Sequence, residues 1–156
     1  MPMMRVVVLV LLAWFAAVAA AQDLPQKFDP ARDAAKDVAI AAAKAKAQGK
    51  RVLLDVGGEW CSWCHILDRF LAADSEVRGL RDAGYVWVKV NWSKENKNEA
   101  LLSRWPAIAG YPHLFVLDGD GKLLHSQDTG ALESGKGYDR AKFSAFLRKW
   151  APPKAL

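Results

Sequence analysis

The chain has 156 residues, of which 52% are hydrophobic and 25% charged; this composition excludes an intrinsically disordered protein and suggests one globular domain. Its formal net charge is +5, but the Lys and Arg residues are spread over alanine-rich and aromatic segments. This distribution favours solvated helix faces over a nucleic-acid-binding patch, so no nucleic-acid partner is expected.

The N-terminus has the pattern of a secretory signal peptide. An apolar stretch from Val6 to Ala21 follows Arg5, and Ala19-Ala20-Ala21 supplies a small-residue cleavage site. The stretch is shorter than the roughly 20 residues that a spanning helix needs, so we predict a cleaved signal over residues 1–21. An uncleaved membrane anchor is the alternative. Export would place the mature protein in the periplasm or outside the cell, where disulfides persist.

The remainder of the chain is expected to alternate between helices and strands. We expect a linker over residues 22–28, a folded domain over residues 29–151 and a tail over residues 152–156. Capping residues and apolar periodicity predict helices over 29–48, 61–73, 75–83, 95–105 and 139–150. Aliphatic and β-branched runs predict strands over 51–56, 85–91, 113–117 and 122–127. This order predicts an α/β fold, with a sheet that is parallel at its centre, an antiparallel hairpin at one edge, and helices on both faces.

Cys61 and Cys64 are the only cysteines of the chain, and they follow a predicted buried strand and Trp60. Two thiols separated by two residues can close a small disulfide and reopen it, so a strand followed by this motif favours redox chemistry. A purely structural disulfide is the weaker interpretation, because stabilisation by a crosslink grows with the length of the loop it closes.

Four segments of the chain resemble the thioredoxin family, and together they span nearly all of the predicted mature protein. They are Asp55-Val56-Gly57-Gly58-Glu59-Trp60-Cys61, Lys89-Val90-Asn91, Gly110-Tyr111-Pro112 and Thr129-Gly130-Ala131-Leu132. The resemblance implies the thioredoxin fold, a central mixed β-sheet flanked by helices, here with an N-terminal helix extension. The Ser-Trp dipeptide between the cysteines differs from the Gly-Pro of thioredoxin and is similar to exported thioredoxin-like proteins with a WCxWC-type site.

The chemistry of the thiols assigns a role to each cysteine. Cys61 would lie at a helix N-terminus, where free N–H groups and the helix dipole favour the thiolate, so it is the expected nucleophile and Cys64 the resolving thiol. A buried Asp55 would have a raised pKa and accept the proton of Cys64. The resemblance places Lys89 near Asp55. It also implies a cis peptide bond before Pro112. The expected substrate-binding residues are Trp60, Ser62, Trp63, Tyr111 and Pro112.

These residues predict an exported protein thiol–disulfide oxidoreductase that needs no cofactor. We expect it to act as a monomer and to reduce disulfide-containing protein substrates. The resemblance implies a membrane electron donor of the Dsb type. A disulfide-forming oxidant of the same fold is the main alternative, and an interaction module without activity is disfavoured because both cysteines are present.

The motif Cys61-Ser62-Trp63-Cys64-His65 also matches CxxCH, the attachment site of c-type haem. All three methionines lie within the predicted signal peptide, so the mature chain offers no axial Met, and His113 or His125 would have to serve. A tetrahedral metal site built from the two cysteines, His65 and His113 is a third interpretation. We expect neither a haem nor a metal ion.

Overall fold

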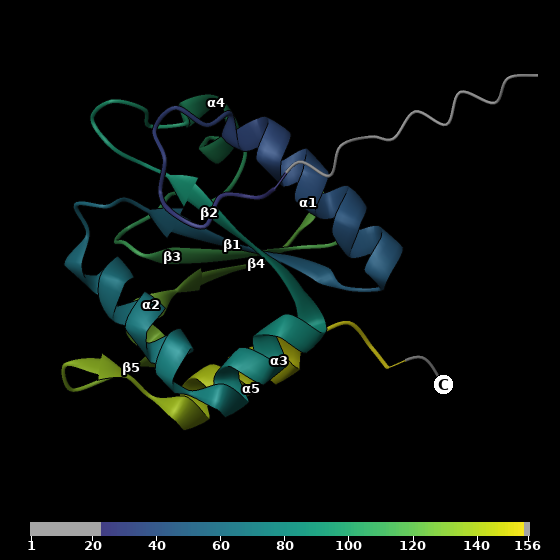
Figure 1. Ribbon diagram of the computed structural model, residues 1–156, viewed down its shortest axis with the longest axis vertical. Helices are drawn as coiled ribbons and strands as arrows, with labels where there is room; N and C mark the ends of the chain where they lie inside the picture. The colour runs from purple at the N-terminus through teal and green to yellow at the C-terminus, as the bar shows by residue number, and fades with distance from the viewer. Residues whose placement is uncertain (1–22, 155–156) are drawn as a thin grey trace, which may run out of the picture.

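The computed structural model describes residues 23–154, and a four-stranded sheet in the order β2-β1-β3-β4 forms its centre (Figure 1). The strands are β1 (Arg51–Gly57), β2 (Tyr85–Asn91), β3 (His113–Leu117) and β4 (Leu123–Asp128). β1 pairs in parallel with β2, whereas β3 pairs antiparallel with both β1 and β4. The mixed central sheet confirms the fold class predicted from the sequence, but its parallel pair lies at the β2 edge, and the central pair of β1 and β3 is antiparallel.

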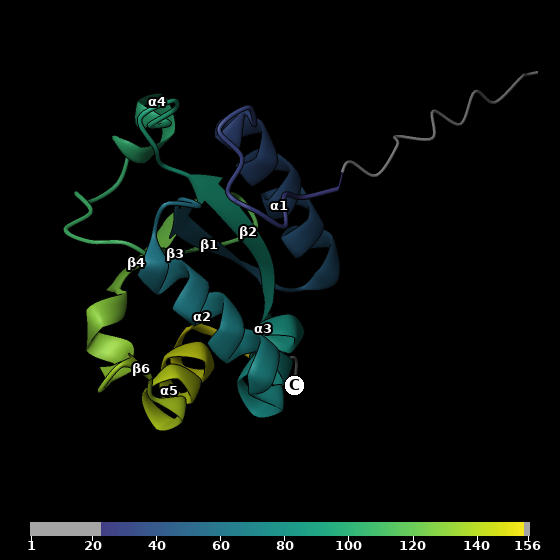
Figure 2. The same ribbon diagram turned by 60° about the vertical axis from the view of Figure 1, so that its left-hand side comes forward.

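Helices cover both faces of this sheet (Figures 1 and 2). α1 (Ala34–Gln48) and α4 (Glu99–Leu102) lie on one face, and α2 (Ser62–Ala73), α3 (Ser75–Gly84) and α5 (Arg140–Trp150) lie on the other. Successive side chains of a strand point to opposite faces. Val52, Leu54 and Val56 therefore pack on the α1 side, whereas Leu53 packs with α2, α3 and α5. The same alternation turns Asp55 toward the α2 side.

α1 begins five residues later than predicted. The Asp33 side chain accepts the N–H of Lys36 and caps the helix, while Asp29 instead closes a turn by accepting the N–H of Ala31 at 2.8 Å. Asp33 thus caps the helix in place of Asp29, although Asp29-Pro30 is also typical of a helix start. The helix ends as predicted at Gly49, whose φ of 64° is the left-handed conformation that glycine adopts readily.

The helix predicted over residues 95–105 is also shorter, because only Glu99–Leu102 is helical. The preceding loop is held by side-chain amides rather than by helical hydrogen bonds: Asn91 donates to the Asn96 carbonyl oxygen at 2.9 Å, and Asn98 donates to the Asn91 carbonyl oxygen at 2.6 Å. Asn98 itself has a φ of 48°, which interrupts a right-handed helix at that position.

A short insertion between β4 and α5 was not predicted. A 3₁₀ turn over Thr129–Leu132 leads into a two-stranded hairpin of β5 (Glu133–Ser134) and β6 (Gly137–Tyr138). Strands of two residues carry too little alternation to be recognised in a sequence. The hairpin packs β6 against α2.

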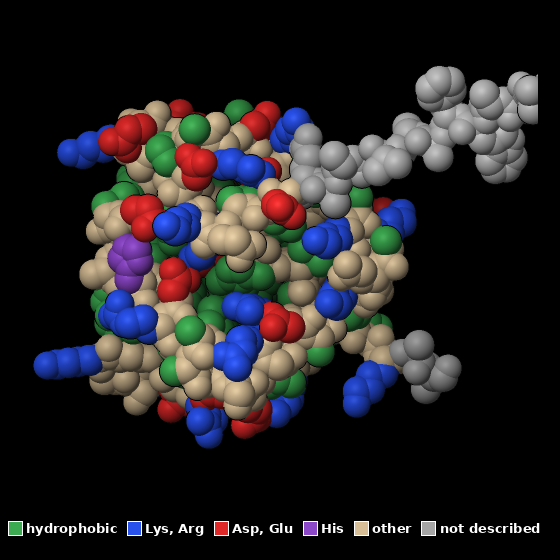
Figure 3. Space-filling view, viewed as in Figure 1, with side chains coloured by type: hydrophobic (Ala, Val, Ile, Leu, Met, Phe, Trp, Pro, Cys, Tyr) green, Lys and Arg blue, Asp and Glu red, His purple; other side chains and the backbone are tan. Residues whose placement is uncertain are grey.

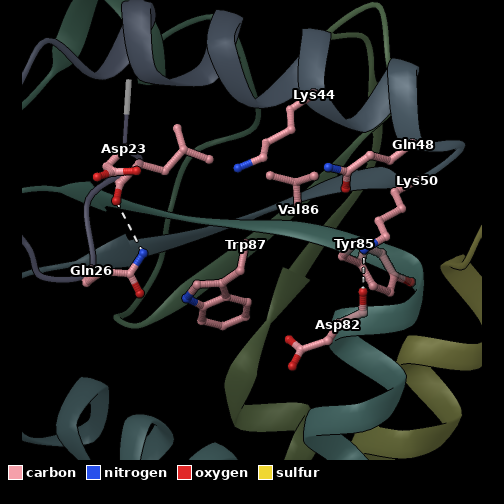
Figure 4. Close-up of a pocket in the computed structure, with 10 residues that line it drawn as sticks. Asp23, Gln26, Lys44, Gln48, Lys50, Asp82, Tyr85, Val86 and Trp87 are labelled. Carbon is pink, nitrogen blue, oxygen red and sulfur yellow. Dashed lines mark hydrogen bonds between the residues drawn. The ribbon is translucent and has the colours of Figure 1, made fainter. Parts of the chain in front are cut away.

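A cavity of about 510 Å³ lies at the outer edge of β2 (Figure 4). It is lined by Asp23 and Gln26 of the N-terminal segment, by α1, and by the first residues of β2. Lys50 and Asp82 also line it, and Lys50 donates to the carbonyl oxygen of Asp82 at 2.7 Å. These residues lie at the amino end of β2, whereas the cysteines follow the carboxyl end of β1. The cavity is therefore separate from the CxxC motif.

The predicted signal peptide, residues 1–21, lies outside the described residues. Within residues 23–154, no helix has both the length and the apolar character needed to cross a membrane. On the face seen in Figure 3, Lys and Arg side chains are interspersed with Asp and Glu.

Candidate active site

The two cysteines lie at the turn from β1 into α2 and are joined by a disulfide. Cys61 is the N-cap residue of α2, and its sulfur accepts the N–H of Cys64 at 3.1 Å. Cys61 keeps 4% of its surface exposed, whereas Cys64 is fully buried one turn deeper. On reduction, the free N–H groups and the dipole of α2 would stabilise a Cys61 thiolate.

Gly57, the last residue of β1, makes room for this disulfide. A Cβ atom at this position would overlap the Cys64 sulfur and lie 3.1 Å from the Phe28 ring. Interiors are packed too closely to absorb such an atom without displacing a neighbour. The active site therefore requires a residue without a side chain at position 57.

We expect Gly57→Ala to destabilise the oxidised protein by about 1–3 kcal/mol, because the added methyl group overpacks the sulfur of Cys64. The measurement is the urea midpoint of the oxidised variant against wild type. Gly79→Ala is the matched control, since a Cβ at Gly79 in α3 meets nothing within 4 Å and should leave the stability unchanged or raise it. Equal midpoints for Gly57→Ala and wild type would contradict the steric argument.

A cluster of three charged side chains joins β1, β2 and α2, and two of them, Asp55 and Lys89, are buried. Asp55 and Lys89 are register partners on β1 and β2, and Lys89 Nζ donates to Asp55 Oδ2 at 3.0 Å. The same ammonium group donates to Asp68 Oδ1 at 2.7 Å. Asp68 lies four residues after Cys64 on α2, so both project from one face of the helix. Sequence reasoning missed Asp68, although its helical spacing from Cys64 was a usable signal.

Burial decides the protonation of this cluster. Burial raises the pKa of Asp55 to about 6, and the positive charge of Lys89 offsets only part of that effect. Burial lowers the pKa of Lys89, but the Asp55 and Asp68 carboxylates outweigh it and raise the pKa overall. Among the described residues, Asp55 Oδ1 has no hydrogen-bond partner. Asp55 can therefore gain or lose a proton near neutral pH, while the neighbouring Lys89 keeps its positive charge.

Phe28, which precedes α1 in the chain, packs against this cluster. It is 2% exposed, although it lies in the segment expected to be a linker. Its ring packs against both cysteines, and the Lys89 ammonium lies 4.1 Å from the ring centroid. Its backbone N–H donates to Glu59 Oε1 at 3.0 Å, which ties the segment to the loop before Cys61. Phe28 was not predicted from the sequence, because a single apolar residue before a helix does not indicate a contact with the active site.

An aromatic group of Trp60, Trp92 and Tyr111 lies beside the cysteines, because Tyr111 packs against the cluster that contains Cys61. Trp60 is 56% exposed, and its indole N–H donates to the carbonyl oxygen of Trp92 at 2.8 Å. The Trp92 ring stacks on Tyr111 with 4.8 Å between centroids, and Trp60 meets both rings edge-on. Trp63 packs instead on Tyr138 of β6, at 5.7 Å between centroids. Trp92 and Tyr138 were not predicted.

The loop before β3 lies beside the cysteines. The Tyr111–Pro112 peptide bond is cis, and Tyr111 packs against the cluster of Phe28 and the two cysteines. Thr129 holds this loop in place, because its buried hydroxyl donates to the Pro112 carbonyl oxygen at 2.6 Å. Ser62 lies exposed on the first turn of α2.

The histidines that were considered as haem or metal ligands form hydrogen bonds with other groups. His65 Nε2 lies 2.7 Å from the Glu59 carbonyl oxygen, and His113 Nε2 lies 2.8 Å from Ser126 Oγ. Burial lowers the pKa of His113. No group of three or more His, Cys, Asp or Glu side chains that could hold a metal ion occurs within residues 23–154. The two sulfurs that a haem would need are bonded to each other.

Comparisons with known proteins agree with this geometry. A family model described as thioredoxin-like matches residues 33–119. The thiol:disulfide interchange protein DsbD of Klebsiella pneumoniae is 27% identical over 109 residues, which is 69% of this chain and 17% of that protein. DsbD of Pseudomonas fluorescens is 31% identical over 108 residues, 68% of this chain and 17% of that protein. The chain thus spans only a small part of the length of these relatives.

Solved structures show the same architecture. The crystal structure of a disulphide isomerase from Xylella fastidiosa Temecula1 is 27% identical, with a TM-score of 0.67, over 81% of this chain and 96% of that chain. The oxidised C-terminal domain of DsbD from Neisseria meningitidis shares the fold at 22% identity, with a TM-score of 0.57, over 76% of this chain and 96% of that chain. Since the family model matches more than half of its residues, the chain belongs to the thioredoxin-like family, and its Cys61–Cys64 disulfide has the redox-type CxxC spacing.

Proposed function

We propose that the protein is exported and reduces disulfide bonds in other proteins, with Cys61 as the nucleophile and Cys64 as the resolving thiol. The observation that carries this proposal is the asymmetry of the pair. Cys61 caps α2 beside an exposed tryptophan, whereas Cys64 is fully buried behind it. A substrate disulfide can therefore approach Cys61 first.

The reaction balances as a two-electron exchange. The Cys61 thiolate attacks one sulfur of the substrate disulfide, a Cys61–substrate disulfide forms, and the second substrate sulfur leaves as a thiolate. The Cys64 thiolate then attacks Cys61 Sγ, which closes the enzyme disulfide and releases the first substrate sulfur. The substrate gains two electrons and the enzyme loses two.

Asp55 is the proposed proton acceptor for Cys64. Within residues 23–154 its Oδ1 has no hydrogen-bond partner, and together with a pKa of about 6 this suits a group that takes up a proton at neutral pH. Lys89 joins Asp55 to Asp68, which lies one helical turn beyond Cys64. The Phe28 ring packs against Cys64 and also lies under the Lys89 ammonium, so it links the resolving thiol to this group of charges. Lys89 favours the ionised form of Asp55 and would keep it available as a base.

Five further residues are proposed to bind the substrate chain. The backbone at Tyr111 and Pro112 would pair with an extended substrate segment, while Trp60, Ser62 and Trp63 would contact it around Cys61. The exposed ring of Trp60 offers apolar surface at the site without burying a charge.

A reductase in an oxidising compartment must be re-reduced. We propose that a membrane dithiol donor of the Dsb type supplies the two electrons and becomes oxidised to its own disulfide. The predicted signal peptide would deliver the protein to that compartment, where it would act as a monomer. The similarity to part of DsbD supports a partner of this class.

The reduction potential of the Cys61–Cys64 pair tests the direction of this reaction. We expect a value near the roughly −270 mV of thioredoxin when the protein is equilibrated with dithiothreitol or glutathione. A value near about −120 mV would overturn the reductase and support a disulfide-forming oxidant instead. The absence of a reversible couple would overturn both.

A further inference from the structure

The N-terminal segment carries Phe28 from the outer edge of β2 to the cysteines. Earlier residues of the segment line the cavity at that edge (Figure 4), whereas a Cβ atom at Gly57 would lie 3.1 Å from the tip of the Phe28 ring. Two hydrogen bonds hold the segment in this course. The Phe28 N–H donates to Glu59 Oε1 at 3.0 Å, and Asn96 Nδ2 donates to the Pro30 carbonyl oxygen at 2.9 Å. The position of the ring is therefore fixed by the backbone on both sides of it.

The Phe28 ring touches both the resolving thiol and the neighbouring charges. It packs against Cys64, and Lys89 Nζ lies 4.1 Å from the ring centroid. The Lys89 ammonium donates to Asp55 Oδ2 at 3.0 Å and to Asp68 Oδ1 at 2.7 Å. A buried cation also needs a favourable contact where no carboxylate reaches it, and the face of an aromatic ring attracts cations. Phe28 therefore fits this place better than an aliphatic residue would.

Solvent lies close to this group of charges. The side chain of Asp68 is 39% exposed, whereas those of Lys89 and Asp55 are 6% and 0% exposed. Without the Phe28 ring, the vacated space would be bordered by an ammonium group and a sulfur. Water enters a space with polar lining, whereas a purely apolar cavity stays dry. Because burial raises the pKa of Asp55 to about 6, water in this space should lower that pKa.

We propose that Phe28 is a positioning residue of the redox site, whose ring keeps water away from the Cys64 sulfur and from the Asp55–Lys89 pair. Phe28 touches no substrate and acts only through these groups. The inference rests on the proposed transfer of the Cys64 proton to Asp55, because a carboxylate that is shielded from water is a stronger base than an exposed one. The N-terminal segment, which precedes the first helix, thereby becomes part of the catalytic apparatus.

The test follows the titration of Asp55 in the oxidised mature protein, by NMR of a labelled carboxyl carbon whose signal is identified by its loss in Asp55→Asn. We expect Phe28→Ala to move the midpoint of this titration about one pH unit lower, because water reaches the carboxylate. Phe28→Leu should stay close to wild type, because Leu still fills most of the space. The other groups that act electrostatically on Asp55 are the same in every variant: Lys89 from β2, Asp68 from α2 and Tyr138 from β6.

Leu24→Ala is the matched control. Leu24 lies in the same segment and is buried, but it packs in the core on the α1 side of the sheet. Its truncation should lower the stability and leave the Asp55 midpoint unchanged. An unchanged midpoint in Phe28→Ala, or an equal shift in Leu24→Ala or in Phe28→Leu, would overturn the inference. If Phe28→Ala does not unfold cooperatively, Phe28→Val takes its place and the same outcomes decide.

Release of the reduced substrate from its disulfide with Cys61 is the second measurement, and it separates this inference from the proposed function. We expect Phe28→Ala to slow the release at pH 7 by up to about tenfold, because Asp55 becomes a weaker base as its pKa falls. Leu24→Ala should release substrate at the wild-type rate. A lowered Asp55 midpoint with wild-type release in Phe28→Ala would overturn Asp55 as the proton acceptor, while the exclusion of water by Phe28 would stand.

Discussion

Cys64→Ser is expected to accumulate a covalent disulfide between Cys61 and its substrate protein, because the first exchange remains intact and the resolving thiol is absent. Cys61→Ser should form no such adduct and should lose disulfide reduction by at least about a thousandfold, since Ser cannot accept the substrate sulfur. The measurement is non-reducing electrophoresis after mixing each variant with a disulfide-containing protein, together with turnover.

The two variants form a matched pair, since each removes one sulfur and leaves the other. The reverse pattern, with adducts in Cys61→Ser and none in Cys64→Ser, would show that the buried thiol attacks first. That result would contradict the roles inferred from the N-cap position and from the burial of Cys64. Adducts in neither variant would contradict a mixed-disulfide mechanism.

Asp55→Asn is expected to stabilise the oxidised protein and to slow its catalysis. The pKa of Asp55 is raised from 3.8 to about 6 in the fold, so the folded state binds more protons than the unfolded state between these pH values. The free energy of unfolding of wild type should therefore fall as pH rises from about 4 to about 6. At pH 8 the variant should gain up to about 3 kcal/mol over wild type, and near pH 3.5 the difference should vanish.

The same substitution removes the proposed proton acceptor. Release of the reduced substrate should slow by about a hundredfold or more, which is the lower end of the effect of a positioned acid or base. Urea unfolding at pH 3.5 and pH 8 and rapid-quench measurement of the mixed disulfide test the two effects separately. Asp68→Asn is the control, because it removes a carboxylate from the same lysine but leaves the buried acid in place. A variant that is destabilised at pH 8 would contradict the dominance of burial.

Local patterns in the sequence predicted the four strands of the central sheet, most helices and the CxxC motif. β1, β2 and β3 follow from aliphatic runs, and each covers at least the residues predicted. Where local signals competed, the prediction failed: Asp33 caps α1 in place of Asp29, and the amides of Asn91 and Asn98 replace part of the predicted helix before Pro106. In both places several local conformations have similar free energies. Side-chain hydrogen bonds select one of them, and which of these bonds form depends on the neighbouring structure.

The two cysteines and the buried Asp55–Lys89 pair could be named from the sequence because their spacing resembles a known family. Tertiary structure alone decided what surrounds them. Phe28 reaches the site from the N-terminal segment, Asp68 from the second turn of α2, and Thr129 from the turn after β4. The physical reason is that periodicity and capping act over a few residues, whereas burial, the raised pKa of Asp55 and the shape of a cavity arise from contacts between segments distant in the chain.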